Sequence, residues 1–104
     1  MSNTVRNTLK LVIIVCLVIQ SAWAGQDINQ DEAKTLRQEG LILPLEQILQ
    51  AAQRVHPGRV IEVELEKKRD LYIYEVEISD SNGQVWEMKF NASDASLLSQ
   101  EQDD

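Results

Sequence analysis

Glutamates alternate with other residues in three segments of this chain, and carboxylates at that spacing can bind cations or basic partners. The residues concerned are Glu62, Glu64, Glu75, Glu77 and Glu87. Alternation with period two places every second side chain on the same face of a β-strand. The sequence therefore predicts one acidic sheet face, which also carries Leu71 and Ile73, and this face is the candidate partner-binding surface.

Two interpretations of this acidic face stay open. As a solvated strand face it keeps the sheet soluble and discourages pairing between molecules. As a functional surface it binds a basic partner or holds Ca²⁺ weakly through oxygen ligands. An exposed apolar spot surrounded by acidic residues is typical of a partner-binding surface. Alternate positions of one strand are too far apart for a compact cation cage. We therefore predict no defined metal site and no cofactor.

The remaining residues with chemical potential are few. A single histidine, His56, and a single cysteine, Cys16, cannot supply the ligand set of a transition metal. We expect His56 to end a helix, where an imidazolium suits the helix dipole. Ser79 or Ser81 could join His56 and Asp80 as a triad, but nothing places a serine on a strained turn beside the histidine. The sequence predicts no catalytic residue and no enzyme.

Size and charge exclude further classes. The chain has 104 residues with ten basic and seventeen acidic groups, a formal charge of −7. A field of that sign repels phosphate, so a nucleic-acid binder is excluded. One cysteine excludes a disulfide scaffold, and the length excludes a multidomain enzyme.

Residues 1–24 have the pattern of a secretory signal peptide. Arg6 and Lys10 precede the apolar run Leu11–Ile19, and small residues lead to a cleavage site between Ala24 and Gly25. A membrane anchor needs about 20 apolar residues, and this run has nine. Lipidation at Cys16 is disfavoured by the bulky residue before it. We therefore expect a periplasmic protein with no stable membrane insertion after cleavage.

Two helices are expected before the strands. Asn29 can cap a short peripheral helix that Gly40 stops, and an apolar connector, Leu41–Leu43, follows. Pro44 then suits the first position of a second helix. That helix has one apolar stripe and ends before Pro57; the stripe consists of Leu45, Ile48, Leu49, Ala52 and Val55.

Three strands follow, over Val60–Lys67, Leu71–Ile78 and Val85–Phe90. Their apolar faces coincide in an antiparallel meander covered by the second helix, which defines an α+β fold. Core residues include Ile61, Tyr72, Tyr74 and Trp86. The outer edges of the first and third strands would be open to strand addition by a peptide or a second copy.

The turns set the predicted register. A two-residue turn at Lys68-Arg69 pairs Leu65 with Tyr72 and places Glu62 beside Glu75. A three-residue loop, Ser81-Asn82-Gly83, pairs Ile78 with Trp86 and needs Gly83 in the left-handed region. The predicted organisation is a leader (1–24), a peripheral segment (25–43), the main domain (44–98) and a flexible acidic tail (99–104).

The stretch Leu45–Phe90 resembles the PepSY domain family. It carries a helix, a Pro-Gly before the first strand, a Val-x-Glu-x-Glu-Leu strand, the segment Tyr-x-Tyr-Glu-Val-Glu-Ile and a strand after a glycine turn. The family's last strand usually runs into an Asp-x-x-Thr-Gly turn. Here that segment reads Asn91-Ala92-Ser93-Asp94-Ala95-Ser96 and lacks the glycine.

The resemblance implies a noncatalytic exported module that binds another polypeptide. PepSY domains occur in propeptides of thermolysin-like metalloproteases and in small exported proteins, so inhibition or regulation of an exported peptidase is the implied function. The alternative is an accessory or sensor module that responds to cations or to the state of the envelope.

Overall fold

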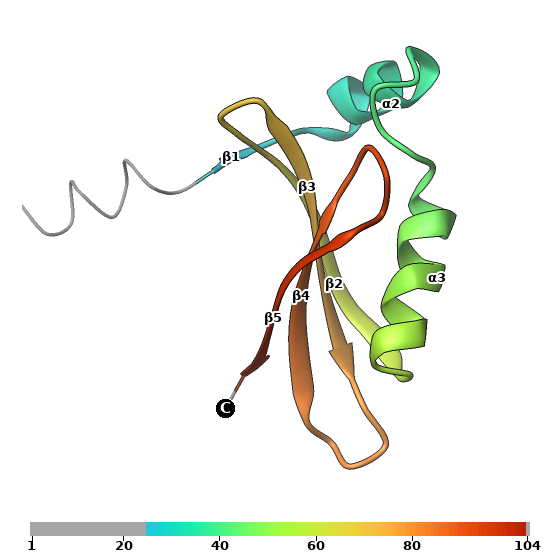
Figure 1. The fold of residues 1–104 in the computed structure, drawn as a ribbon, viewed down its shortest axis with the longest axis vertical. Helices are drawn as coiled ribbons and strands as arrows, with labels where there is room; N and C mark the ends of the chain where they lie inside the picture. Colours follow the sequence, from blue (N-terminus) through green and yellow to red (C-terminus); the bar gives the residue numbers. More distant parts are fainter. Residues whose placement is uncertain (1–24, 104) are drawn as a thin grey trace, which may run out of the picture.

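The computed structural model describes residues 25–103, which form an α+β fold with two helices and a five-stranded antiparallel sheet (Figure 1). The strands lie in chain order, β1-β2-β3-β4-β5. The elements are β1 (Gln26–Asp27), α2 (Gln30–Gln38), α3 (Leu45–Val55), β2 (Arg59–Lys68), β3 (Leu71–Ser79), β4 (Val85–Asn91) and β5 (Leu97–Asp103). The predicted leader, residues 1–24, lies outside the described residues.

The short helix α2 forms as its capping residues predict. Asn29 Oδ1 accepts a hydrogen bond from the Glu32 N–H at 2.9 Å, which satisfies one of the free donors of the first turn. Gly40, with φ +74°, takes the left-handed conformation that follows the helix end. Ala33 and Leu36 are buried, so even this polar helix contributes to the core.

Helix α3 spans the predicted residues and presents the predicted stripe to the sheet. Ile48 and Ala52 are fully buried, and the other stripe residues pack against the same core. Pro44 lies one position earlier than predicted, at the N-cap, with φ −57° and ψ 144°. The helix ends at His56, whose extended backbone is the conformation favoured before a proline.

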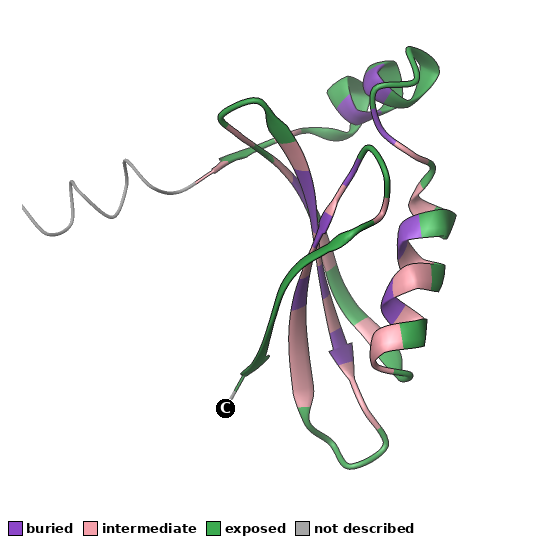
Figure 2. Cartoon of the chain, viewed as in Figure 1, coloured by how far each residue is buried: buried purple, intermediate pink, exposed green. Residues whose placement is uncertain are grey.

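The core lies between the helices and one face of the sheet (Figure 2). Its largest fully buried side chains are Ile48, Val76, Ile78, Met88 and Phe90. Tyr74 is buried and Tyr72 half-buried, as the strand phase predicts. Trp86 is half-buried and stands at the margin, stacked on His56.

The β3–β4 hairpin has the predicted loop and register. Ile78 lies opposite Trp86, and the Asp80 N–H donates to the Gln84 carbonyl at 2.8 Å, which closes a three-residue loop. Gly83 has φ +77°. The left-handed position that this loop requires is therefore filled by the one residue type that adopts it without strain.

The predicted β2–β3 turn is wrong by one residue. Lys68 pairs with Leu71, so Arg69 and Asp70 form the turn, and Arg69 has φ +58°. Leu65 consequently lies opposite Tyr74 and not opposite Tyr72. Both registers keep the apolar side chains on one face, so the hydrophobic period alone could not choose between them.

Strand β2 also contains a β-bulge between Val60 and Glu62. The extra residue, Ile61, is 48% exposed, whereas Val60 packs against the core. Ile61 was predicted to face inward from strict alternation. A bulge adds one residue to one strand and reverses the alternation beyond it, which accounts for the difference.

The predicted three-stranded sheet gains a strand at each edge. Two-residue β1 pairs with β2 through Gln26 and Asp27, and β5 pairs along β4. The tail from Ser99, expected to be flexible, therefore belongs to a strand that begins at Leu97. The edge of β4 is covered, contrary to prediction, and the open edges are β5 and the part of β2 beyond β1.

The turn that lacks the family's glycine nevertheless forms. Ala95 takes the glycine's place with φ +64°, and its N–H donates to the Asn91 carbonyl at 2.8 Å. The side chains of Asn91 and Asp94 accept backbone hydrogen bonds from Ser93 and Ser96. These bonds hold Ala95 in a conformation that costs an L-residue about 1 kcal/mol, so the chain still turns from β4 into β5.

Candidate functional site

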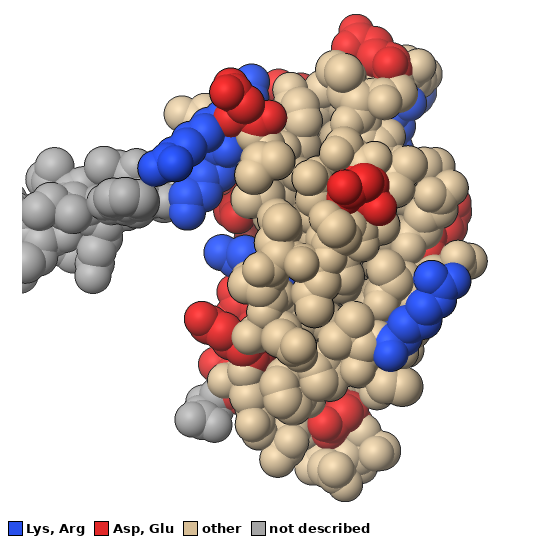
Figure 3. Space-filling model, in the orientation of Figure 1, with Lys and Arg blue, Asp and Glu red and all other residues tan. Residues whose placement is uncertain are grey.

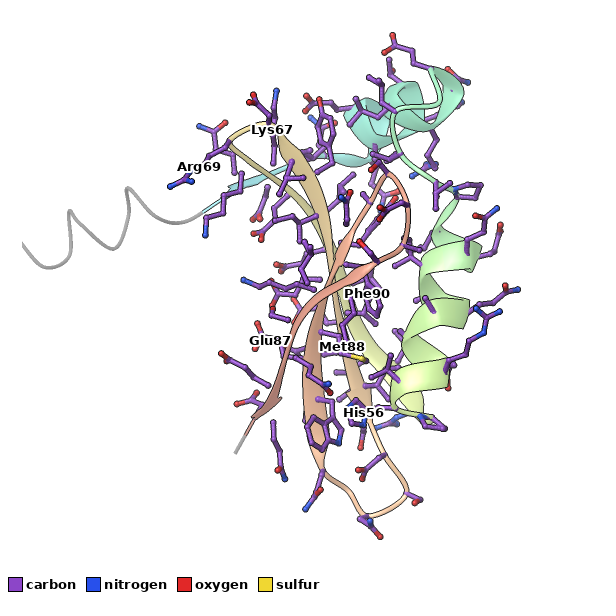
Figure 4. All side chains as sticks on the ribbon, in the orientation of Figure 1. His56, Lys67, Arg69, Glu87, Met88 and Phe90 are labelled. Carbon is purple, nitrogen blue, oxygen red and sulfur yellow. The ribbon has the colours of Figure 1, made fainter. Side chains whose placement is uncertain are left out.

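The sheet face turned away from α3 carries a row of four glutamates, one on each of four neighbouring strands. Glu62 lies opposite Glu77, Glu77 opposite Glu87, and Glu87 opposite Glu101. Figure 4 shows Glu87 on this face, whereas Met88 and Phe90 point toward α3. We call this row, together with Glu64 and Glu75, the acidic face.

A second row runs beside the first and contains a lysine. Glu64 lies opposite Glu75, and Glu75 opposite Lys89. Lys89 Nζ also lies 4.0 Å from Glu66 Oε1. The predicted neighbours Glu75–Lys89 and Glu77–Glu87 are confirmed, but Glu62 does not lie beside Glu75 because the β2–β3 register differs.

Crowding of like charges shifts the pKa values on the acidic face upward. A hydrogen bond with Glu87, then partial burial, then repulsion from Glu87 raises the pKa of Glu75 to about 8. A hydrogen bond with Glu62 and repulsion from it raise the pKa of Glu64. Loss of solvation, followed by the charges of Glu62 and Glu87, raises the pKa of Glu77. Glu75 thus holds a proton near neutral pH.

Three of these carboxylates form a compact group. Oxygens of Glu75, Glu77 and Glu87 lie within 4.8 Å of one another. The sequence predicted no such group on the argument that alternate positions of one strand are too far apart. That argument is wrong here, because Glu75 and Glu77, alternate positions of β3, both reach each other and Glu87 of β4. Ca²⁺ takes about six to eight oxygen ligands, so a cation held here would keep several waters. An all-carboxylate ligand set of this kind suits Ca²⁺, Mg²⁺ or Mn²⁺.

The apolar part of the predicted surface is smaller than expected. Ile73 is only 5% exposed, which contradicts its predicted role as an exposed contact. It lies between Glu66 and Asn91 on the neighbouring strands, in the middle of the sheet. Leu71, at the hairpin end of β3, remains 43% exposed, and Leu41 of the connector is also exposed while Ile42 is buried.

Three basic residues, Lys67, Lys68 and Arg69, follow one another at the β2–β3 turn. Figure 3 shows blue side chains gathered at the upper left of the molecule. Lys67 Nζ lies 5.4 Å from the centre of the Tyr72 ring, a cation–π arrangement. The β2–β3 turn is therefore a local basic cluster at one end of a sheet whose central rows are acidic.

His56 contacts side chains of β4 and β5, and these contacts indicate a structural role. Its ring stacks on Trp86, with centroids 3.8 Å apart and planes 9° apart. Its Nε2 lies 2.6 Å from Gln100 Oε1 on β5. Asp80 accepts from Trp86 Nε1, and this bond, with those from backbone N–H groups, lowers the pKa of Asp80. The imidazole joins α3 to β4 and β5.

Sequence reasoning missed Glu101, which extends the glutamate row onto β5. Its segment, Leu97–Asp103, is polar on both faces from Ser99 onward, and all of its residues are exposed. Such a segment has no hydrophobic period, and backbone pairing with β4 is what makes it a strand. The only available signal was its length, which is sufficient for an edge strand.

The comparisons with known proteins agree with this fold. The family model described as "Peptidase propeptide and YPEB domain" (PepSY) matches residues 42–101. Neither the search of curated proteins nor the search of solved structures found a match.

Domains of this family are generally noncatalytic propeptide or regulatory modules, and they are typically extracellular or periplasmic. Among residues 25–103, neither helix has the length and apolar character needed to span a bilayer. The matched segment covers more than half of the chain and runs from the connector before α3 into β5. This chain therefore belongs to the PepSY family.

Proposed function

We propose that this protein is a noncatalytic periplasmic module that binds an exported peptidase and regulates it through the acidic face. The observation that carries the proposal is the glutamate row across β2, β3, β4 and β5. Like charges directly opposite one another destabilise a sheet, so four in one row impose a cost on the free protein. A basic partner surface would offset that cost on binding.

Charge reversal on this row should weaken the complex. The variant Glu62→Lys/Glu77→Lys changes two directly opposed residues, one exposed and one half-buried. We expect at least a roughly tenfold loss of affinity, because attraction is replaced by repulsion at the centre of the contact. The measurement is a titration of the peptidase captured by crosslinking in a periplasmic extract, followed by its residual activity.

The control carries the same change in net charge at a remote place. Glu32→Lys/Glu39→Lys alters exposed positions at the two ends of α2. This variant should bind like the wild type if the acidic face is the contact. Equal losses in both variants would indicate a general field effect, and unchanged affinity in the first would exclude the face.

A second candidate function, a sensor module that responds to cations, is favoured by the compact group of Glu75, Glu77 and Glu87. A divalent cation would compete with the proton held by Glu75. Millimolar Ca²⁺ should therefore raise the melting temperature more at pH 8 than at pH 6, and Glu75→Gln should abolish the increase. Mg²⁺ and matched ionic strength with NaCl serve as controls, and an equal response to NaCl would reject a specific site.

A further inference from the structure

A groove of about 710 Å³ lies between the start of α3, helix α2 and the outer edge of β2. Its apolar lining includes Ile28, Leu45, Val63 and Leu65. Tyr74 also lines it, although this residue is only 3% exposed. The groove is on the helix side of the sheet, separate from the row of glutamates on the opposite face.

The Tyr74 hydroxyl lacks a hydrogen-bond partner among the residues that the structure describes. A buried hydroxyl without a partner is uncommon because its lost solvation is not compensated. The group can both donate and accept. An occupant of the groove that carries a backbone amide or a polar atom would supply the missing partner.

The backbone beside the groove is also open. Strand β1 covers β2 only at Glu66 and Lys67, and the last bond on this side runs from the Ile28 N–H to the Leu65 carbonyl. In an antiparallel strand alternate residues turn their N–H and C=O groups to the same side. Val63, two residues from Leu65, therefore presents its backbone groups outward, and no described residue pairs with them there.

The two faces of β2 define the side chains that an added strand would carry. On the helix side it would lie beside Val63 and the apolar groove, and on the other side beside Glu62 and Glu64. An added strand alternates its side chains in the same way. Apolar residues would suit the first side and lysine or arginine the second.

We propose that the β2 edge and this groove form a binding site for a short extended peptide with alternating apolar and basic side chains. The peptide adds a strand beside Val63, inserts an apolar side chain into the groove and provides a partner for the Tyr74 hydroxyl. The bulge at Ile61 ends regular pairing beyond Glu62, so the segment is short. This site shares Glu62 and Glu64 with the acidic face and differs from the proposed peptidase contact in using the β2 edge and the groove.

The proposal is tested by measuring the binding of three hexapeptides with blocked termini to the isotope-labelled protein. The protein is purified after expression of the full chain. The first alternates lysine and valine, the second alternates lysine and serine, and the third has proline at the central valine of the first. Binding is followed by amide chemical shifts and by hydrogen exchange at Val63. We expect the first to slow exchange at Val63 and to bind roughly tenfold more tightly than the others, which lose the apolar insertion or the strand pairing.

The variant Tyr74→Phe separates binding from stability. Because the hydroxyl has no partner in the free protein, its removal should leave the melting temperature unchanged or raised. Affinity for the lysine–valine peptide should nevertheless fall about fivefold. Equal binding of the lysine–serine peptide, equal binding of the proline peptide, or shifts confined to β5 would each overturn the proposal.

Discussion

Gly58→Ala is expected to unfold this protein or to remove most of its stability. A Cβ at this position would lie 2.2 Å from the Ser79 carbonyl oxygen and 2.7 Å from Ile78 Cγ2. The Gln53 side chain fixes the glycine from both sides, accepting from its N–H at 3.0 Å and donating to its carbonyl at 2.8 Å. The backbone therefore cannot move away from β3 without breaking these two bonds.

The expected loss is at least about 3 kcal/mol, the upper range for overpacked sites. Small domains have roughly 5–15 kcal/mol in total, and this one has no disulfide to support it. Urea unfolding followed by circular dichroism measures the effect. Folding can also be assayed by the amount of soluble protein recovered.

Gly40→Ala is the matched control. This glycine has φ +74°, but a Cβ there would meet nothing within 4 Å. Its substitution should cost only about 1 kcal/mol, the strain of a left-handed L-residue. Similar losses at both positions would mean that contact with β3 is not what requires a glycine at position 58.

Stability should decline as the pH rises from about 4.5 to about 8, and Glu75 should account for most of the decline. In the folded protein the pKa of Glu75 is raised to about 8, chiefly by its hydrogen bond with Glu87, against an ordinary value of 4.5. The folded state thus binds more protons than the unfolded state in this interval. The stability that this proton contributes is fully present below pH 4.5, the pKa of the unfolded state. It is lost as the pH rises through about 8, the pKa of Glu75 in the folded state.

The raised pKa values of Glu64 and Glu77 act in the same direction. The lowered pKa values of Asp80 and Asp94 act in the opposite direction. Their contribution is lost only as the pH falls below the ordinary aspartate value of 3.8, so the two effects do not overlap. Because the side chains are partly exposed and screened, the expected decline is on the order of 1–2 kcal/mol.

Glu75→Gln should flatten this pH dependence and make the protein more stable than the wild type at pH 8. Glutamine keeps the hydrogen bond to Glu87 and cannot ionise. The measurement is urea unfolding at intervals from pH 5 to pH 9 at constant ionic strength. Glu39→Gln, an exposed position after α2, should retain the wild-type slope; a slope unchanged in Glu75→Gln would place its origin elsewhere.

Local signals in the sequence were sufficient for the helices and one hairpin. Asn29 and Gly40 bounded α2, and the apolar stripe defined α3. In the β3–β4 hairpin the three-residue loop kept the apolar faces in phase and placed Gly83 where a left-handed conformation is needed. At the β2–β3 turn two registers kept the faces in phase. Requiring the apolar residues to lie on one face therefore did not select the correct register there, and the neighbours of Glu62 were predicted wrongly.

The remaining differences arise from backbone pairing, which leaves no hydrophobic pattern. Strands β1 and β5 are exposed and lack an apolar face, and the bulge at Ile61 is a local departure from alternation. Most acidic-face residues were predicted from their period. Their compact grouping, the contribution of Glu101 and the burial of Ile73 depend on register and on the edge strands, which periodicity does not specify.

The strand order β1-β2-β3-β4-β5 also bears on how the molecule folds. Each strand from β2 onward pairs with the one just before it, so most contacts join residues close in the chain. Low contact order of this kind is associated with rapid folding. The helix face can be covered early too, because α3 immediately precedes β2. A chain emerging from its N-terminus could thus build the sheet one hairpin at a time, and only the two-residue strand β1 must wait for a partner made later.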